Sequence, residues 1–579
     1  MAARAGLKKA WDWLYERSGL DHIPFYKVPY TYFNLDLWLG GIVAASFFWL
    51  AITGLLLLFY YSPAEPLEST KATIFERPFG AMILTSHLYA AHFMLIAAIV
   101  HATRNLLKGA YKRPRELVWI MGVLTGFLAL QTAFFGYSLV GDRIAEEAVN
   151  IGKALNLRGL GETIGLYVIN ALFTLDPEQQ YFRLLAIHVF SATLLFLMFM
   201  LHFGLFEMHG PAPKEEETGW KVEPSKVDQN RPDIAPWFPV NFVFILALTL
   251  SVWGLIVFVA GIAQRFAEAL PPLLSPYPVE AEDFVPRPPW FFLYAYRIFQ
   301  FTFLTLPVES VPQLLQLLVS MVLPVVILIA LPFIDRAGSR HPLDRPLATI
   351  VGVLMLVYFA QLTFWGFIEA GKPFGLNETL VALAPPFFAV TGGMYLLRKV
   401  WTGRSVEAVD MAAVAGYVVA GSLLPFLIGM ARGLPSLGEE AATGLLGLGL
   451  TVVILGWIAM KMRQPQGRGK ATEAAGAKSV ASNPDDDIPG YLLAIGVAEF
   501  AIVVFSAVSL AAIAVIDPVA FAVEATLLTG LLLLAGGGLA HLIFRALVAG
   551  RVPPEGFIGE VKPHILPLLA ALITFILLV

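Results

Sequence analysis

Thirteen apolar segments, each long enough to cross a lipid bilayer as a helix, restrict this chain to very few folds. A bilayer-spanning helix needs about 20 apolar residues, and its backbone groups must be hydrogen-bonded within the segment. Of the 579 residues, 58% are hydrophobic and only 14% are charged. The sequence therefore predicts an all-α polytopic membrane protein. The predicted spans lie near residues 38–60, 80–108, 116–140, 180–206, 237–263, 311–334, 346–370, 378–400, 410–432, 440–462, 489–515, 519–545 and 563–579.

Charged residues differ between alternate loops. Lysine and arginine gather in one set of loops, as at Lys108, Lys112 and Arg345, whereas the other set holds acidic residues such as Glu280. Because basic loops stay in the cytoplasm, we expect the plasma membrane of a prokaryote, with a cytoplasmic N-terminus and an external C-terminus. Residues 1–30 lack the apolar core of a cleavable signal and predict an amphipathic helix in the headgroup region.

Four histidines form two pairs with the same 14-residue gap, and each pair lies within one predicted span. Fourteen residues turn through about 1,400° and rise about 21 Å, so the histidines of a pair share one helix face at two depths. If the two spans pack side by side, each cross-helix couple offers imidazole nitrogens to one iron. We therefore predict two stacked bis-histidine haems. The couples are His87 with His188 and His101 with His202. Structural or loop positions are expected for His22, His92, His341, His541 and His564.

Four glycines repeat this 14-residue gap in two other spans, Gly40 with Gly54 and Gly122 with Gly136. A glycine inside a helix costs about 1 kcal/mol relative to alanine. Close approach of a flat macrocycle would explain that cost, and packing of helices through small residues is the alternative. The matched spacing favours clearance for a haem.

Cysteine is absent from the sequence. This excludes disulfides, cysteine-ligated iron–sulfur clusters and thioether-attached haem within the chain. The predicted haems are therefore held non-covalently. Axial histidines suit a b-type or an a-type haem equally, so the haem type stays open.

These features resemble the cytochrome b subunit of quinol:cytochrome c oxidoreductases, the cytochrome bc and b6f complexes. The resemblance covers about residues 30–372. Long, C-terminally extended forms of this subunit occur in archaeal quinol-oxidase and bc-like assemblies, some with a-type haem, and this chain looks like that branch. Besides the histidines and glycines, the resemblance rests on residues 104–111, Gly136-Tyr137, Arg183 five residues before His188, residues 288–296, residues 332–335 and residues 345–348.

The resemblance and the polar loops together divide the chain. The last five spans carry few charges, so we expect docking or scaffolding there rather than chemistry. The expected regions are an interfacial segment at 1–30, a four-helix bundle for two haems at 31–210, a cytoplasmic loop at 211–236, a C-terminal cytochrome b region with the quinol-site loop at 237–402, and additional transmembrane helices at 403–579 with a flexible loop at 463–488.

Several positions depart from the pattern of the resembled family. Pro289 and Phe291 stand where its quinol-site motif has glutamate and tyrosine, and Leu84 stands where an arginine pairs with a haem propionate. At the inner quinone site, a Lys-Asp pair is replaced by Phe244 and Ile245. Proline has no side chain that can take a proton, so other groups must accept the protons of quinol.

The resemblance implies that quinol binds near the outer haem and gives one electron to a Rieske iron–sulfur protein and the other to the haem chain. Proton acceptors there need a pKa that burial can tune. The implied quinol site holds Pro288, Pro289, Trp290, Phe291 and Tyr294. The candidates for quinone contact are, in this order, Tyr137, Tyr296, Asp142 and Glu282. For proton exit the same four residues are candidates in the reverse order. Arg183 is a candidate for cofactor binding, and Glu207 and His209 for an inner quinone site.

The expected partners are membrane quinone, the Rieske protein and terminal oxidase or cytochrome acceptor subunits, within an oligomeric respiratory complex for which a dimer is one option. No nucleic-acid partner is expected. One alternative is a haem subunit of a quinol-oxidase supercomplex without a working inner quinone-reduction site. A secondary transporter and a haem-free structural anchor are the alternatives from other classes.

Overall fold

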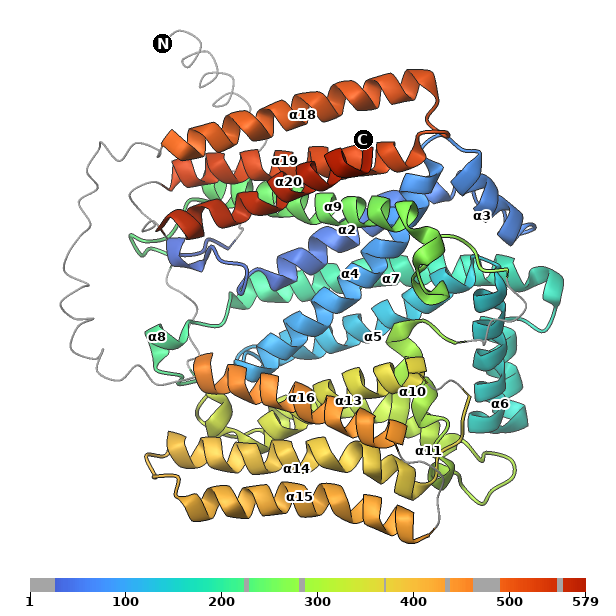
Figure 1. The fold of residues 1–579 in the computed structure, drawn as a ribbon, viewed down its shortest axis with the longest axis vertical. Coiled ribbons are helices and arrows are strands. Elements are labelled where there is room, and N and C mark those ends of the chain that lie inside the picture. The colour runs from blue at the N-terminus through green and yellow to red at the C-terminus, as the bar shows by residue number, and fades with distance from the viewer. Residues whose placement is uncertain are drawn as a thin grey trace.

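The computed structural model describes residues 26–222, 229–280, 287–368, 371–432, 438–461, 490–548 and 556–578. Within them, twelve helices are long and apolar enough to cross a membrane, and they run side by side (Figure 1). The predicted all-α polytopic class is confirmed. His22, Glu282, the predicted loop 463–488 and most of segment 1–30 fall outside the described residues.

The spanning helices follow the predicted segments closely. The thirteenth segment coincides with α20, whose apolar stretch Val561–Leu577 is shorter than the others. The central spans are α2 (Leu39–Leu57), α4 (Gly80–Leu107), α5 (Glu116–Ser138), α7 (Gln180–His209) and α9 (Phe242–Arg265). The later helices are α10 (Trp290–Ile298), α11 (Leu314–Leu317), α12 (Leu323–Ile334), α13 (Pro346–Ile368), α14 (Leu376–Trp401), α15 (Ala408–Ala431), α16 (Gly438–Lys461), α18 (Gly490–Ile516), α19 (Ala522–Leu547) and α20 (Gly556–Leu578).

Three further helices lie outside the spans, α3 (Pro66–Phe75), α6 (Arg143–Leu172) and α8 (Glu215–Thr218). Helix α6 was not predicted, and it runs across the ends of the spans rather than along them (Figure 1). The carboxylate of Asp142 caps it by accepting a hydrogen bond from the backbone N–H of Ala145. We call the end of the bundle near α8 the α8 side, and the opposite end the α6 side.

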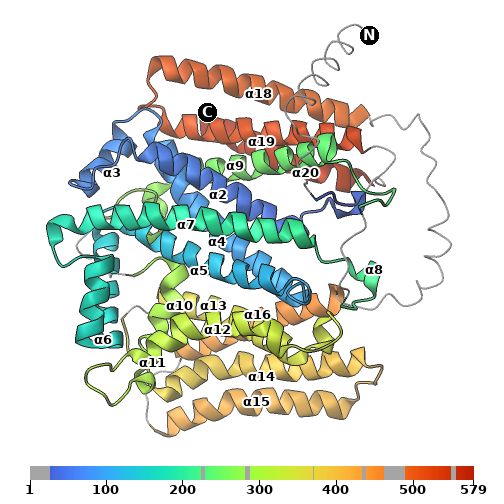
Figure 2. The same cartoon turned by 180° about the vertical axis from the view of Figure 1, so that it is seen from behind.

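The helices form layers around a central group of α2, α4, α5 and α7 (Figure 1). Helix α2 packs on α4, and α5 packs on α7. Figure 2 shows the same order from behind, with α14 and α15 at one edge and α18 and α19 at the other. The region expected at 403–579 is therefore divided. Helices α15 and α16 pack on α14, whereas α19 packs on α9 and is flanked by α18 and α20.

Helices α9 and α19 approach each other through glycines. A Cβ atom on Gly254 would lie 2.6 Å from the backbone nitrogen of Leu534, and one on Gly530 would lie 2.5 Å from that of Phe258. Such contacts require small residues, because in lipid the attraction between helices depends on close packing of their backbones. These contacts attach the C-terminal helices α18–α20 to α9 and the central group of helices.

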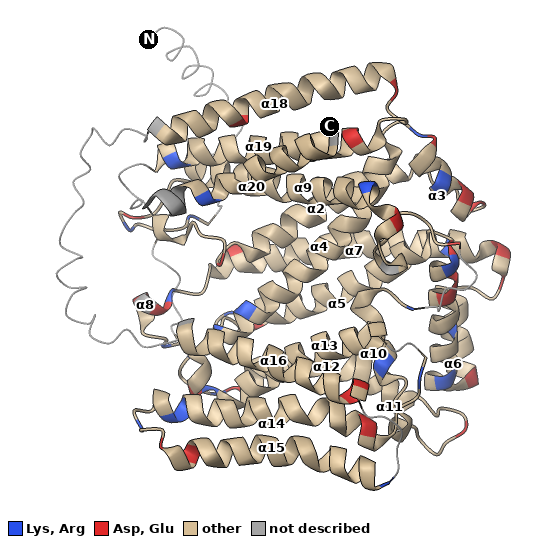
Figure 3. Cartoon of the chain, viewed as in Figure 1, with Lys and Arg blue, Asp and Glu red and all other residues tan. Residues whose placement is uncertain are grey.

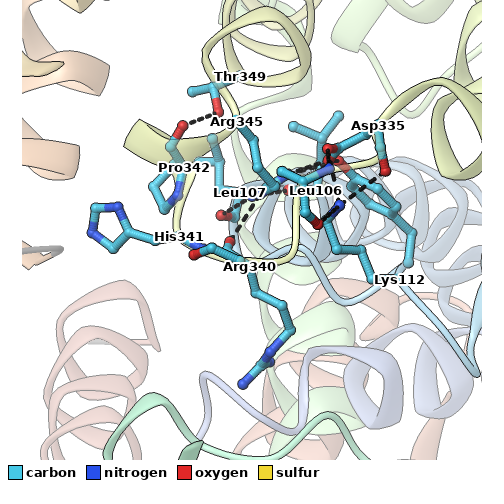
Figure 4. A network of polar contacts seen from close by, with 12 residues as sticks. Leu106, Leu107, Lys112, Asp335, Arg340, His341, Pro342, Arg345 and Thr349 are labelled. Carbon is cyan, nitrogen blue, oxygen red and sulfur yellow. Dashed lines mark hydrogen bonds and ion pairs between the residues drawn. The ribbon is translucent and has the colours of Figure 1, made fainter. Parts of the chain in front are cut away.

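A buried charge network joins the central bundle to the later helices on the α8 side (Figure 4). The guanidinium of Arg345, fully buried, donates to the hydroxyl of Tyr111 at 2.6 Å and to the carbonyl of Leu107 at 2.8 Å. Lys112 pairs with Asp335 at 2.9 Å, and the Tyr111 hydroxyl also donates to the Asp335 carboxylate. The two motifs at residues 332–335 and 345–348 thus contact the loop that follows α4.

This network predicts an acid-sensitive contribution to stability. Burial alone would raise the pKa of Asp335, but hydrogen bonds from Tyr111 and Lys112 and the charge of Arg345 outweigh burial and hold that pKa below its ordinary value. A carboxyl with a lowered folded pKa stabilises the fold above its unfolded pKa of about 3.9, and this contribution is lost as the pH falls through the folded pKa. Unfolding temperatures measured over a pH series should therefore fall more steeply below about pH 4 in the wild type than in Asp335→Asn. Equal slopes would contradict this assignment.

Candidate haem sites and quinol site

The four paired histidines line the space between α4 and α7 at two depths. The rings of His87 and His188 face each other on the α6 side, with centroids 6.5 Å apart and planes 77° apart. On the α8 side, His101 and His202 are close enough to interact electrostatically. The structure therefore brings together the couples that the 14-residue gaps predict.

Hydrogen bonds orient three of these imidazoles in the same way. Nδ1 of His188 lies 3.0 Å from the carbonyl of Thr132, and Nδ1 of His202 lies 3.0 Å from that of Val118. Since a carbonyl can only accept, each ring carries its proton on Nδ1 and leaves the Nε2 lone pair free.

His87 follows the same pattern through a threonine hydroxyl. Its Nδ1 lies 2.9 Å from Oγ1 of Thr53, whose own proton goes to the carbonyl of Trp49 at 2.7 Å. His101 differs, because the Asn105 amide lies 3.2 Å from its Nε2. A metal bound at that nitrogen would take the place of the amide.

Each of the four glycines lies against one of the four histidines. A Cβ on Gly136 would be 2.6 Å from Cε1 of His188, and a Cβ on Gly54 would be 3.2 Å from Cε1 of His87. On the α8 side, Gly40 faces His101 and Gly122 faces His202, both at 3.1 Å. The matched spacing thus reflects clearance for the imidazole rings, a contact that sequence spacing alone did not reveal. With neutral imidazoles as donors and room kept for their rings, these residues could hold the iron of two haems.

Basic side chains near the α8-side couple line a cavity of about 180 Å³. Arg104, Lys108, Lys214 and Arg340 contribute to its wall, together with carboxylates such as Glu215. Arg104 is paired with Asp36 at 3.0 Å. Figure 3 shows few charged residues along the spans, with most charged residues near the helix ends.

Helix α10 brings the implied quinol-site residues against the central bundle. Pro289 precedes the helix, and Phe291 is buried between α4 and α5. The indole N–H of Trp290 donates to Nδ1 of His92 at 2.7 Å. Tyr294 packs on Phe359, with ring centroids 5.1 Å apart. His92, expected to be only structural, therefore positions the first residue of α10, and sequence spacing could not have found this contact.

Tyr296 lies on another face of α10 from Tyr294. It lines a cavity of about 230 Å³ that is also lined by Arg158 of α6 and by Gln300 and Gln313. Two residues that the sequence placed in one candidate set thus face different surroundings, because positions two apart on a helix point in nearly opposite directions.

Tyr137 and Asp142 lie at the α6-side end of α5. The hydroxyl of Tyr137 is buried and has no hydrogen-bond partner among the described residues. It interacts electrostatically with Asp142, which is 7% exposed. Burial raises the pKa of Asp142, although the backbone N–H groups of Val279 and Ala145 oppose that shift. A raised pKa makes this carboxylate a better proton acceptor.

The other candidates have separate positions. Arg183 is exposed and donates to the carbonyl of Ala171 at 3.2 Å. Glu207 accepts a hydrogen bond from the backbone N–H of Tyr26 at 2.6 Å, and the carbonyl of His209 accepts one from Arg115. These contacts hold the α8-side ends of the helices together.

Phe244, at the inner site implied by the resemblance, lies in an aromatic cluster. Its ring centroid is 4.8 Å from that of Trp38 and 5.1 Å from that of Phe544 on α19. Ile245 is 37% exposed. Apolar packing by a C-terminal helix therefore occupies the place of the polar pair.

The fold and these histidines define a polytopic helical membrane protein built around two histidine couples, and comparison with known proteins names its class. Residues 71–278 match the family described as "Cytochrome b(N-terminal)/b6/petB", and residues 284–384 match "Cytochrome b(C-terminal)/b6/petD". A cytochrome b of Sulfolobus acidocaldarius is 34% identical over 436 residues, which is 72% of this chain and 76% of that protein. A cytochrome b/c1 of Bradyrhizobium diazoefficiens is 26% identical over 455 residues, 75% of this chain and 61% of the relative.

The fold is also similar to a solved structure. A chain of a hyperthermophilic respiratory Complex III superposes with a TM-score of 0.50 at 20% identity, over 72% of this chain and 98% of that chain. The chain belongs to the cytochrome b family. It is a multi-pass membrane subunit for haem-based electron transfer, of the kind found in respiratory oxidoreductase complexes. The family matches end at residue 384, so α15–α20 lie beyond them.

Proposed function

We propose that this chain oxidises quinol on its α6 side and passes electrons across the membrane between two bis-histidine sites. The proposal rests on one observation, the four histidines that lie in two couples with a glycine beneath each ring. His87 and His188 would hold the outer haem, and His101 and His202 the inner one. When bound, the haems supply one-electron redox chemistry.

The second electron of quinol needs a separate acceptor, because each haem takes only one. A Rieske iron–sulfur protein on the α6 side is the proposed partner, with a terminal oxidase or cytochrome acceptor beyond it. The basic residues of the α8 side support a cytoplasmic position for that side under the positive-inside rule. This orientation places the proton-releasing site outside the plasma membrane of a prokaryote.

The residues around the N-terminus of α10 would bind the quinol ring. Trp290 is held by His92, and Phe291 and Tyr294, which pack against neighbouring helices, would supply apolar contacts to the ring. Tyr137 offers a buried hydroxyl that no described residue satisfies, as a quinone oxygen would require. Asp142, which interacts electrostatically with Tyr137, is the proposed first proton acceptor. It would take the role of the glutamate for which this chain has Pro289.

A second candidate function follows from the aromatic cluster around Phe244. Three rings, those of Phe33, Trp38 and Phe544, pack on it. Such packing supports a haem subunit of a quinol-oxidase assembly that lacks an inner quinone-reduction site. Electrons would then leave the α8-side couple for another subunit.

Spectroscopy of the purified chain tests the proposal. A reduced-minus-oxidised spectrum should show two low-spin haem bands, and a pyridine haemochrome assay should identify b-type or a-type haem. Oxidation of a quinol analogue by the native complex should reduce both haems. A protein without haem would leave only the transporter and anchor alternatives.

Replacing Tyr137 by phenylalanine should slow quinol oxidation without loss of haem. Losing one hydrogen bond of about 1 to 1.5 kcal/mol lowers turnover about five- to twelvefold. Tyr61→Phe is the matched control, because the hydroxyl of Tyr61 is already bonded to the carbonyl of Leu139 at 2.8 Å. Unchanged turnover in Tyr137→Phe would remove this residue from the quinol site.

A further inference from the structure

Three ionisable side chains from the last three helices meet inside the membrane region. Nδ1 of His564 on α20 lies 2.9 Å from Oε1 of Glu499 on α18, and both side chains are fully buried. Nδ1 of His541 on α19 lies 3.4 Å from Nε2 of His564, with ring centroids 5.3 Å apart. Ionisable groups at this depth are costly and are usually functional.

The packing of the helices leaves room for these three side chains. A Cβ on Gly538 would lie 2.2 Å from Oε1 of Glu499, so only glycine leaves room for the carboxylate there. The other oxygen, Oε2, is buried and has no hydrogen-bond partner among the described residues. This oxygen can accept a hydrogen bond or a proton, and it belongs to the side chain of the three that lies deepest in the membrane.

Of the three side chains, His541 lies nearest the α8 side. Counted from the helix ends at about 1.5 Å per residue, His541 lies about 9 Å deep, His564 about 12 Å and Glu499 about 14 Å. Arg545 interacts electrostatically with His541 from one turn nearer that side. Lys562 precedes His564 on α20 and also lies nearer that end, whereas Glu524 lies at the opposite end of α19.

We propose that His541, His564 and Glu499 form a proton-transfer chain between the α8-side surface and a buried carboxylate in the middle of the membrane. A metal site fits less well, because no group of three such side chains among the described residues has the geometry to hold a metal ion. These three residues lie beyond the parts of the sequence that match the family. They are on helices for which the sequence suggested only docking or scaffolding.

Proton transfer along this chain balances without any co-reactant. A proton arriving on Nε2 of His541 makes that ring cationic, and the ring then releases its Nδ1 proton to Nε2 of His564. His564 in turn releases its Nδ1 proton to Oε1 of Glu499, which becomes a neutral carboxylic acid. One proton has moved from the α8 side to Glu499. Both imidazoles are again neutral, and each now carries its proton on Nε2 instead of Nδ1.

Infrared spectroscopy of the full-length protein in lipid nanodiscs tests this proposal, whether or not haem is bound. At low pH the wild type should show a carbonyl band of a protonated carboxyl group that disappears in Glu499→Gln. Labelling the glutamates with carbon-13 should shift the same band, which assigns it to a glutamate rather than to an aspartate. After transfer to deuterated buffer, exchange of this carboxyl proton should be at least tenfold slower in His541→Gln and in His564→Gln.

Ser506→Ala is the control, because this serine is also buried on α18 and is not part of the chain. Its exchange rate should match that of the wild type. Two results would overturn the proposal. A band that is absent at every pH would mean a permanent ion pair between Glu499 and His564, and an unchanged exchange rate in His541→Gln would mean that protons reach the carboxylate by another route.

Discussion

Replacing His101 by leucine should remove about half of the haem iron bound per chain and leave the α6-side haem spectrum in place. Leucine offers no lone pair to iron, so the partner His202 cannot hold the group alone. The two couples are about 21 Å apart along the helix, so loss of one should not disturb the other. Haem content per chain and the reduced-minus-oxidised spectrum measure both effects.

His209→Leu is the matched control, because this histidine lies on the same α8 side and belongs to neither couple. It should keep the full haem content. Equal loss of both haem bands in a His101→Leu protein that keeps its helical circular dichroism would contradict the assignment of couples. An unchanged haem content would remove His101 from the ligands.

Replacing Arg345 by methionine should have the largest effect on stability. Its guanidinium is fully buried and bonds Tyr111, the carbonyls of Leu106 and Leu107, and the carbonyl of Arg340. Removing one partner from a buried network leaves the remaining groups uncompensated, which costs about 3–5 kcal/mol. Denaturant unfolding in detergent should show this loss.

Lys71→Met is the matched control for this substitution. Lys71 pairs with Glu280 at 2.8 Å, but that carboxylate is 58% exposed. Such a surface pair contributes at most about 1 kcal/mol. Similar small losses in the two variants would mean that the buried network does not stabilise the junction between the central bundle and the later helices.

The sequence also indicated some contacts whose partners it could not identify. The glycine spacing indicated that some group lies close to each glycine. The structure shows that this group is the imidazole ring of His188 or of one of the other three paired histidines. The motif at residues 288–296 suggested one site, yet Tyr294 and Tyr296 face different surroundings. Pattern and spacing show which residues share a helix face, but not which neighbouring helix that face meets.

Helix α6 was missed for a related reason. It carries Glu146, Lys153 and Arg158, so it has no long apolar run to indicate a span, and its place across the helix ends depends on contacts with other elements. The split of the C-terminal helices was equally hidden. Both edges of the bundle offer apolar surfaces, and the backbone contacts of Gly254 and Gly530 select one of them for α19.

The sequence by itself determined the all-helical membrane class, the approximate positions of the twelve spans found among the described residues, and the two depths of the paired histidines. These features depend only on local apolar length and on the helical repeat of about 3.6 residues. The tertiary structure alone decided that His92 holds Trp290 and that Glu499, His541 and His564 meet. Such contacts join residues that are far apart in the chain, and they form only when helix packing brings particular faces together.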